Sequence, residues 1–331
     1  MRKRRIFNQL LMLLFAGQLA AQDAIYSQFY ASPMLTNPAL AGVGLCGGRA
    51  GMQYRNQWTS IPGNFRTGSF AYDQVAPGIG GAFGVSILND VAGDGLLTTT
   101  AVNLVYNYGI NLNKHWTVFT ALQGSYIQRG IDFSRLYFAD QIEAKKGFVK
   151  PTQETLPFER VSLPSFSTGA VISGKGFYAG IAVFHLNEPS QSFYGNPGPG
   201  TYLPRRANIH AGMNIRVGNV RSIREKDQLT LSPNVLFAVQ EKFMQMNLGF
   251  YASKGGLITG LWFRQTGANP DALIAIIGWQ GKKYKVGYSY DVTVSQARAA
   301  VRGSHEVSFA YEFCLEKKVP KNWLNDICPG F

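Results

Sequence analysis

Residues 304–313, with the sequence SHEVSFAYEF, alternate between two kinds of side chain. Large residues, among them Val307 and Phe309, take every second position, and small or acidic residues such as Glu306 take the positions between. Alternation with a period of two is typical of a strand whose two faces meet different surroundings. Such a segment is also about as long as a tilted strand that crosses a bilayer. Many segments of this kind in one chain indicate a transmembrane β-barrel.

The first 21 residues resemble a secretory signal peptide. A basic start precedes the apolar run 10–15, and small residues end the segment at Ala20 and Ala21. The apolar run is shorter than the ~20 residues that a spanning helix needs, so we interpret it as a cleaved signal rather than an anchor. We expect cleavage after Ala21, and therefore a protein that is exported from the cytoplasm.

Segments of alternating hydrophobicity follow one another along the rest of the chain. Charged residues make up only 15% of the 331 residues, while glycines number 37 and tyrosines 16, a composition that suits closed antiparallel β-structure. We count fourteen segments, and single-chain bacterial barrels have an even number of strands. The sequence therefore predicts an all-β fold, an antiparallel transmembrane β-barrel of about fourteen strands. The predicted strands are 49–58, 65–75, 79–89, 96–110, 116–128, 165–173, 176–186, 206–217, 228–239, 243–252, 257–265, 272–280, 284–293 and 303–313.

The lengths of the connections give the barrel a direction. If the first strand rises from the periplasm, the long irregular segments 130–164 and 187–204 fall outside the cell and the short turns fall inside. Long outer loops and short periplasmic turns are the rule for such barrels. The exception is a longer basic turn, 219–226, on the inner side. We divide the chain into a signal peptide (1–21), an N-terminal periplasmic or plug segment (22–48), the outer-membrane barrel (49–313) and a periplasmic C-terminal tail (314–331).

Fourteen strands enclose a lumen too wide for one layer of side chains to fill. The largely apolar residues 24–41, which precede the first strand, are one candidate to plug it. A positive lining could select anions or peptides, but we favour ion pairs across the lumen, with Asp291 among the acidic partners. The residues expected to line the lumen are Arg49, Arg55, Arg66, Arg216, Lys285, Glu306 and Glu312.

Three cysteines, Cys46, Cys314 and Cys328, allow one disulfide and leave one thiol free. An exported protein meets an oxidising compartment, where disulfides persist. Because the last strand of a closed barrel pairs with the first, Cys46 and Cys314 should lie near the same periplasmic rim. We expect one bridge that ties the tail to this rim, and both Cys314–Cys328 and Cys46–Cys314 remain open.

Several motifs that could indicate a cofactor, metal or nucleic-acid site lack the features that such sites need. The GxGxxG match at 42–47 lacks the preceding strand and following helix of a dinucleotide site. The Asp-containing loop 89–95 lacks the bidentate glutamate of a calcium loop, and the four histidines share no metal-ligand spacing. The net charge of +13 admits nucleic acid as a partner, but we find no basic helix or basic–aromatic motif. We expect no catalytic, cofactor or metal site, no nucleic-acid partner and no enzymatic activity.

Three N-terminal motifs resemble the signature of one family. They are SQFYASP at 27–33, NPALAG at 37–42 and YRNQW at 54–58, and the ending CPGF at 328–331 is similar to tails of the same family. On these motifs the chain resembles the PorP/SprF family of outer-membrane β-barrels of the type IX secretion and gliding apparatus. The motifs cover roughly the first fifth of the chain and its last residues, and the Asn-Pro-Ala element alone also occurs in FadL-type channels.

The resemblance implies a non-enzymatic role in export or in surface attachment of a partner secreted protein. It implies periplasmic partners from the secretion system, an adhesin-like client at the surface, and outer-membrane lipid around the barrel. The alternative is a FadL-like or porin-like channel for small hydrophobic or anionic solutes.

Overall fold

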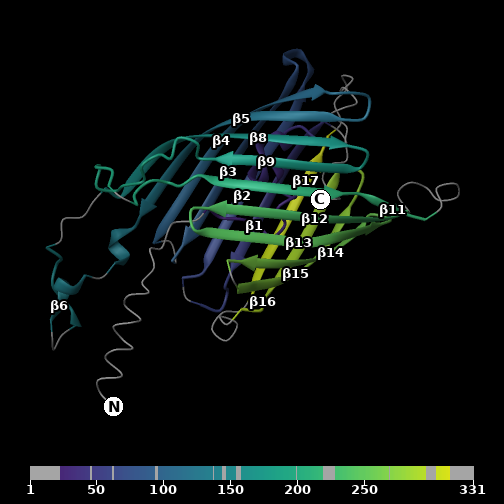
Figure 1. The fold of residues 1–331 in the computed structure, drawn as a ribbon. Helices are drawn as coiled ribbons and strands as arrows, with labels where there is room; N and C mark the ends of the chain where they lie inside the picture. The colour runs from purple at the N-terminus through teal and green to yellow at the C-terminus, as the bar shows by residue number, and fades with distance from the viewer. Residues whose placement is uncertain are drawn as a thin grey trace.

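The computed structural model describes residues 23–44, 47–61, 63–93, 96–136, 138–143, 147–153, 158–198, 200–218, 228–267, 269–295 and 303–313. Most of them lie in strands and in the connections between strands (Figure 1). None of the described helices is long and apolar enough to cross a membrane. The helical turns are α2 (Pro33–Thr36), η1 (Pro38–Leu40), η2 (Pro77–Ile79), η3 (Phe133–Arg135) and η4 (Ala139–Gln141). The strands are β1 (Gly48–Gln57), β2 (Phe65–Ala76), β3 (Gly81–Ala92), β4 (Leu97–Asn111), β5 (Thr117–Ile131), β6 (Ile142–Glu143), β7 (Gly147–Phe148), β8 (Arg160–Gly174), β9 (Phe177–Phe184), β10 (Arg206–Met213), β11 (Ile215–Val217), β12 (Leu229–Gln240), β13 (Phe243–Lys254), β14 (Leu257–Thr266), β15 (Asn269–Gln280), β16 (Tyr284–Thr293) and β17 (Ser304–Glu312).

One sheet closes on itself to form a barrel. Apart from the small β6–β7 hairpin, the described strands pair antiparallel with their neighbours in chain order, and β1 pairs with the last strand, β17. β10 and β11 are two parts of one strand interrupted at Asn214, and β10 joins β9 to β12. Counted in this way, the described residues form a closed ring of fourteen strands. The predicted fold is confirmed, and closure leaves the sheet no open edge in the hydrocarbon.

Strand β17 shows how the alternation separates lipid from lumen. Glu306 and Ser308 are buried, whereas Val307 and Phe309 are exposed on the outer face of the isolated chain. β15, which is apolar on both faces, follows the same rule with Ile274 buried and outward-facing neighbours exposed. The exposed apolar residues therefore form the surface that lipid covers, and the polar residues face inward.

The first long connection is shorter than predicted. β5 continues to Ile131 and β8 already begins at Arg160, so the connection covers 132–159 rather than 130–164. Pro164 suggested a later start for the strand, because proline cannot donate a hydrogen bond to a sheet. In the barrel, the pairing of β8 with β9 begins only at Thr168. Pro164 is opposite Tyr126 of β5, but its carbonyl accepts from Nδ2 of Asn187, on the side away from β5. Its missing N–H faces that same side and therefore costs no bond between strands.

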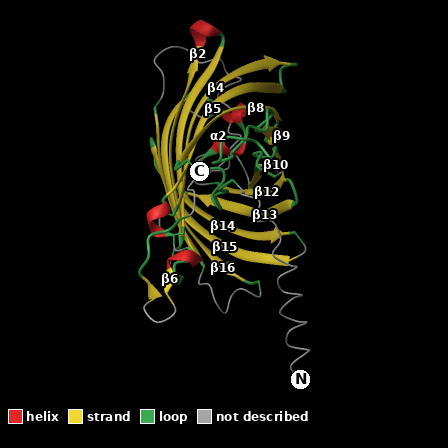
Figure 2. Cartoon of the chain, turned by 90° about the vertical axis from the view of Figure 1, so that its left-hand side faces the viewer, coloured by secondary structure: helices red, strands yellow, loops and turns green. Residues whose placement is uncertain are grey.

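The two ends of the barrel differ in their connections. The long connections 132–159 and 185–205 lie at one end, called here the long-loop end. The opposite end, called the short-turn end, carries the turns 77–80, 112–116, 175–176, 255–256 and 281–283. The predicted signal peptide 1–21, basic turn 219–226 and tail 314–331 lie outside the described residues. Figure 2 shows α2, which precedes β1, surrounded by the strands of the ring.

We predict that Leu261→Arg destabilises the barrel strongly. Leu261 is exposed on the outer face in the middle of β14, and an arginine near the bilayer midplane costs about 2–4 kcal/mol. Leu257→Arg, on the same face at the first residue of β14, is the matched control and should cost about 0–1 kcal/mol. Urea unfolding in lipid vesicles measures both, and equal costs would contradict the assignment of this face to lipid.

Candidate functional site inside the barrel

The chain that precedes β1 lies inside the barrel. We call residues 23–43 the lumen segment. The segment contains two prolines that begin the short turns α2 and η1, so its path is compact and irregular rather than extended. Buried side chains from nearly every part of the barrel wall surround it. The residues of the segment with no exposed surface are Gln28, Tyr30, Asn37, Ala39, Leu40 and Ala41.

The lumen segment runs from one end of the barrel to the other. At the long-loop end the backbone N–H of Asp23 donates to Oε1 of Gln240, the last residue of β12, over 3.0 Å. At the short-turn end the N–H of Gly42 donates to Oδ2 of Asp73, near the end of β2, over 2.8 Å. The segment therefore spans the lumen along its length.

Glu306 of β17 binds the backbone of the segment directly. Its carboxylate accepts hydrogen bonds from the N–H groups of Ser27 (2.9 Å) and Gln28 (2.7 Å). The side chain of Gln28 donates to Oγ of Ser289 (3.1 Å) and accepts from Oγ of Ser308 (2.7 Å). Bonds from N–H groups to a carboxylate are stronger than neutral ones. Side chains on the inward faces of β16 and β17 thus bond the backbone groups of Ser27 and Gln28, which have no neighbouring strand to pair with.

Two buried guanidinium groups neutralise the acidic residues of this wall. Arg55 lies 3.1 Å from Asp291 and 3.2 Å from Glu306. Arg264 lies 2.9 Å from Asp291 and 2.6 Å from Asp271. Removing one partner of a buried network leaves an uncompensated charge, which typically costs about 3–5 kcal/mol. The network therefore holds these side chains in place, including Glu306, which binds the backbone of the segment.

Three asparagines satisfy backbone groups in the second half of the segment. Oδ1 of Asn37 accepts from the N–H of Ala39 (2.9 Å) and caps η1. Asn107 donates to the carbonyl of Ala39 (2.8 Å), and Asn208 donates to the carbonyl of Thr36 (2.9 Å). Buried backbone groups without partners are costly. These bonds give the irregular chain partners for its backbone groups inside the lumen.

Two glycines on the wall make room for Asn37. Nδ2 of Asn37 lies 3.0 Å from Nε2 of His210, next to β8 and β9. A Cβ atom at Gly169 would overlap the side-chain amide of Asn37. A Cβ at Gly180 would lie 2.9 Å from Nδ2 of Asn37 and 2.6 Å from Nε2 of His210. Only a wall without side chains at these two positions admits the segment in this position.

An aromatic cluster anchors the first half of the segment. The ring of Phe29 lies edge-on to Trp262, with centroids 4.9 Å apart. Tyr30 lies edge-on to Tyr178 at 6.0 Å, and Tyr251 contacts Trp262 at 5.2 Å. Edge-to-face pairs add about 0.5–1.5 kcal/mol each beyond the burial of their surface. The cluster joins the segment to β9, β13 and β14.

Asp23 is held by an ion-pair clamp at the long-loop end. Its Oδ2 lies 2.8 Å from Nε2 of His185 and 3.2 Å from Nη1 of Arg206. Burial opposes ionisation of Asp23, but Arg206 and His185 together hold the pKa of its carboxyl well below the ordinary value. His185 follows the end of β9 and Arg206 begins β10. The clamp therefore connects the segment to both ends of the connection 185–205.

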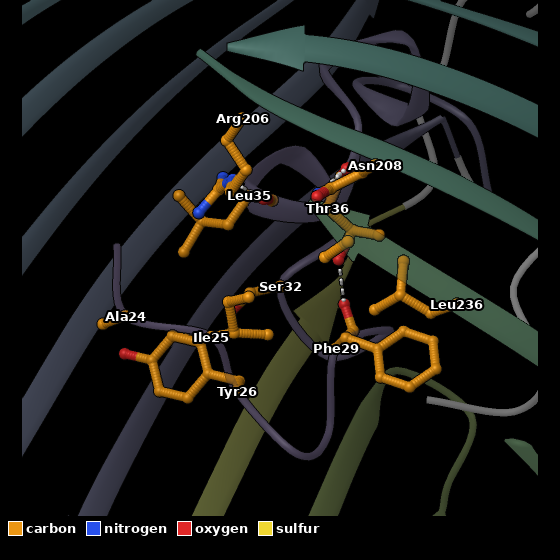
Figure 3. Close-up of a pocket in the computed structure, with 11 residues that line it drawn as sticks. Ala24, Ile25, Tyr26, Phe29, Ser32, Leu35, Thr36, Arg206, Asn208 and Leu236 are labelled. Atoms are coloured by element: carbon orange, nitrogen blue, oxygen red, sulfur yellow. Dashed lines mark hydrogen bonds between the residues drawn. The ribbon is translucent and has the colours of Figure 1, made fainter. Parts of the chain in front are cut away.

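A pocket lies between the segment and the wall beside this clamp (Figure 3). It is lined by Phe29 and Leu35 of the segment, Arg206 and Asn208 of β10, and Leu236 of β12. It holds about 330 Å³ of empty space, part of which is open to solvent. Among the described residues, no three His, Cys, Asp or Glu side chains gather as a metal site. The lining suggests packing rather than chemistry.

The structure gathers five of the seven residues expected in the lumen and places two elsewhere. At the short-turn end Arg49 pairs with Asp73 and Lys285 pairs with Glu312, each at 2.9 Å. Arg55 and Glu306 belong to the network described above. The side chains of Arg66 and Arg216 are exposed, and the three cysteines Cys46, Cys314 and Cys328 lie outside the described residues.

Arg66 was assigned to the wrong face of its strand. On β2 the inward positions are those of Thr67 and Asp73, and Arg66 has the opposite parity. Sequence reasoning also missed Arg206 and Arg264, which line the lumen. Arg206 could have been found, because it has the same parity as the polar residues Asn208 and His210 on its strand.

We predict that Gly169→Ala displaces Asn37 and loosens the segment. The new methyl group overlaps the amide of Asn37, and overpacking a dense core typically costs about 1–3 kcal/mol. Gly124→Ala is the matched control, because a Cβ there meets nothing within 4 Å. Limited proteolysis of the segment and urea unfolding should both distinguish the two variants. A Gly169→Ala barrel that resists both as the wild type does would contradict the packing described above.

The Asp23 clamp predicts a loss of stability in acid. Because its folded-state pKa is lowered, Asp23 stabilises the fold above its ordinary pKa of 3.8, and this contribution is lost as the pH falls below that value. The difference in unfolding free energy between the wild type and Asp23→Asn should be about 1–3 kcal/mol at pH 5 and should shrink as the pH falls below about 4. Asp132→Asn, in an exposed pair with Arg135, is the control. A difference that grows in acid would refute the clamp.

Solved structures of outer-membrane proteins are similar to this chain at low sequence identity. The crystal structure of the Acinetobacter baumannii outer membrane protein Omp33 is similar with a TM-score of 0.45 and 8% identity, over 82% of this chain and 100% of that one. A Pseudomonas aeruginosa FadL homologue gives a TM-score of 0.39 and 11% identity, over 84% and 98%. The KdgM porin gives 0.33 and 8%, over 80% and 99%. No curated protein sequence matches this chain.

A family model covers nearly the whole chain. The model described as "Type IX secretion system membrane protein PorP/SprF" matches residues 18–311. This range includes the lumen segment and the described strands of the barrel, except for Glu312, the last residue of β17. A barrel whose outer face is apolar and a family of secretion-system membrane proteins agree on a location in the bacterial outer membrane. The chain belongs to the PorP/SprF family of type IX secretion system membrane proteins.

Proposed function

We propose that this barrel is a non-enzymatic docking component of the type IX secretion and gliding apparatus. It supports the export or surface attachment of a partner secreted protein, and its work is done at the two ends of the barrel. The observation that carries the proposal is the lumen segment, which is bonded to the wall from Asp23 to Gly42. A barrel that fills its own lumen offers its ends, rather than a pore, to other molecules.

The long-loop end is the side that we assign to the cell surface, since outer loops are long and periplasmic turns short in such barrels. Here the N–H of Phe158 donates to the carbonyl of Phe193 over 2.9 Å, which joins the two long connections. The side chains of Phe158, Tyr194 and Tyr202 are exposed around this contact. Aromatic residues are enriched at protein interfaces. This end suits an adhesin-like secreted client.

The short-turn end is the side that we assign to the periplasm, where secretion-system components would dock. The ion pairs of Arg49 and Lys285 keep this rim of the barrel fixed. Outer-membrane lipid covers the apolar wall between the ends. We retain the signal peptide 1–21, the tail 314–331 and a disulfide among Cys46, Cys314 and Cys328 as proposals of the same kind.

The first test distinguishes docking from transport of small solutes. We predict that the purified barrel in a planar bilayer shows no steady conductance, because the lumen segment occupies the path. Purification from membranes under mild conditions should recover a secretion-system component together with a secreted surface protein. Steady conductance with no such partner would instead support the FadL-like or porin-like channel.

A pair of variants tests which end binds the client. The double variant Phe158→Ser and Tyr194→Ser should lose the secreted partner and keep the periplasmic one. Ile79→Ser, an exposed position in η2 at the opposite end, is the control and should keep the secreted partner. Loss of the client in the control, but not in the double variant, would contradict the proposed orientation.

A further inference from the structure

The first described residues of the lumen segment lie among residues from the long-loop end. Asp23 contacts His185, Arg206 and Gln240. His185 follows β9, Arg206 opens β10 and Gln240 closes β12. All three positions border connections of the long-loop end, and none borders a short turn. The described part of the chain therefore begins at this end of the barrel.

The last residues of the segment lie at the opposite end. Gly42 donates to Asp73, and a Cβ atom on Gly42 would contact the side chains of Val75 and Ala82. These residues belong to the end of β2 and the start of β3, which the turn 77–80 connects. β1 then begins at Gly48 and returns through the wall to the long-loop end. The chain thus crosses the barrel once inside the lumen before it crosses as a strand.

We propose that the mature amino terminus, which cleavage of the signal peptide after Ala21 would leave next to Asp23, emerges at the cell surface beside the connection 185–205. The proposal rests on the orientation given under the proposed function, in which the long-loop end faces outward. Because the chain reaches the periplasmic side only at Gly42, a periplasmic amino terminus would have to pass back through the filled lumen. The dense packing around Tyr30 and Asn37 leaves no such path among the described residues.

The connection 185–205 packs against the barrel wall next to Asp23. Leu203 is buried against Ile127 and Leu163 of the wall, and the N–H of Leu203 donates to the carbonyl of Pro189 over 2.9 Å. The loop is therefore folded onto the barrel rather than extended from it. Asp23 pairs with residues at both ends of this connection, His185 and Arg206, so the start of the segment lies against it.

Epitope accessibility on cells tests the proposal. One short epitope is inserted between Gln22 and Asp23, a second at Asn196 in the long-loop end, and a third at Lys282 in a short turn. Heat-modifiable migration on gels shows whether each of the three barrels is folded. On intact cells the amino-terminal and Asn196 epitopes should bind antibody as well as they do after permeabilisation. The Lys282 epitope should bind only after permeabilisation.

The outcomes separate this inference from the proposed function. If the Asn196 epitope is exposed and the amino-terminal epitope is hidden on intact cells, the surface terminus is wrong and the docking proposal stands. If the Asn196 epitope is hidden and the Lys282 epitope is exposed, the orientation is reversed and both fall.

Discussion

Hydrogen bonding of the backbone is the constraint on which the rest of this structure depends. In hydrocarbon every N–H and C=O group needs a partner within the protein, which forces the strands into a closed ring. A ring of this size leaves a wide lumen. The segment that fills the lumen is irregular, so its own backbone groups also need partners. The wall supplies them with side chains, above all Glu306, Asn107 and Asn208.

The charges of the lumen follow from the same need. Glu306 can accept two backbone N–H groups as a carboxylate, but a buried carboxylate requires compensation. Arg55 provides it and is shared with Asp291, which in turn holds Arg264. The ion pairs therefore serve to seat the segment as well as to join strands. The buried charges of this barrel therefore lie in the lumen, where they hold the segment, and its apolar side chains face the lipid.

The sequence predicted what depends on periodicity. Alternation in β17 placed Glu306 inward and Phe309 outward, and the sheet order followed from chain order. It failed close to the first residues of strands: Arg66 lies at the start of β2, and Pro164 hid the start of β8. The fit of Asn37 against Gly169 depends on an irregular path in three dimensions, which no spacing in the sequence encodes.

The central claim is that the lumen segment is a permanent part of the folded barrel. Hydrogen–deuterium exchange of the backbone amides tests it most directly. The amides of Ser27, Gln28, Ala39 and Gly42 donate to buried acceptors, so they should exchange as slowly as those of β17, only through global unfolding. Exchange as fast as in the connection 58–64 would show that the segment leaves the lumen, and would contradict the account.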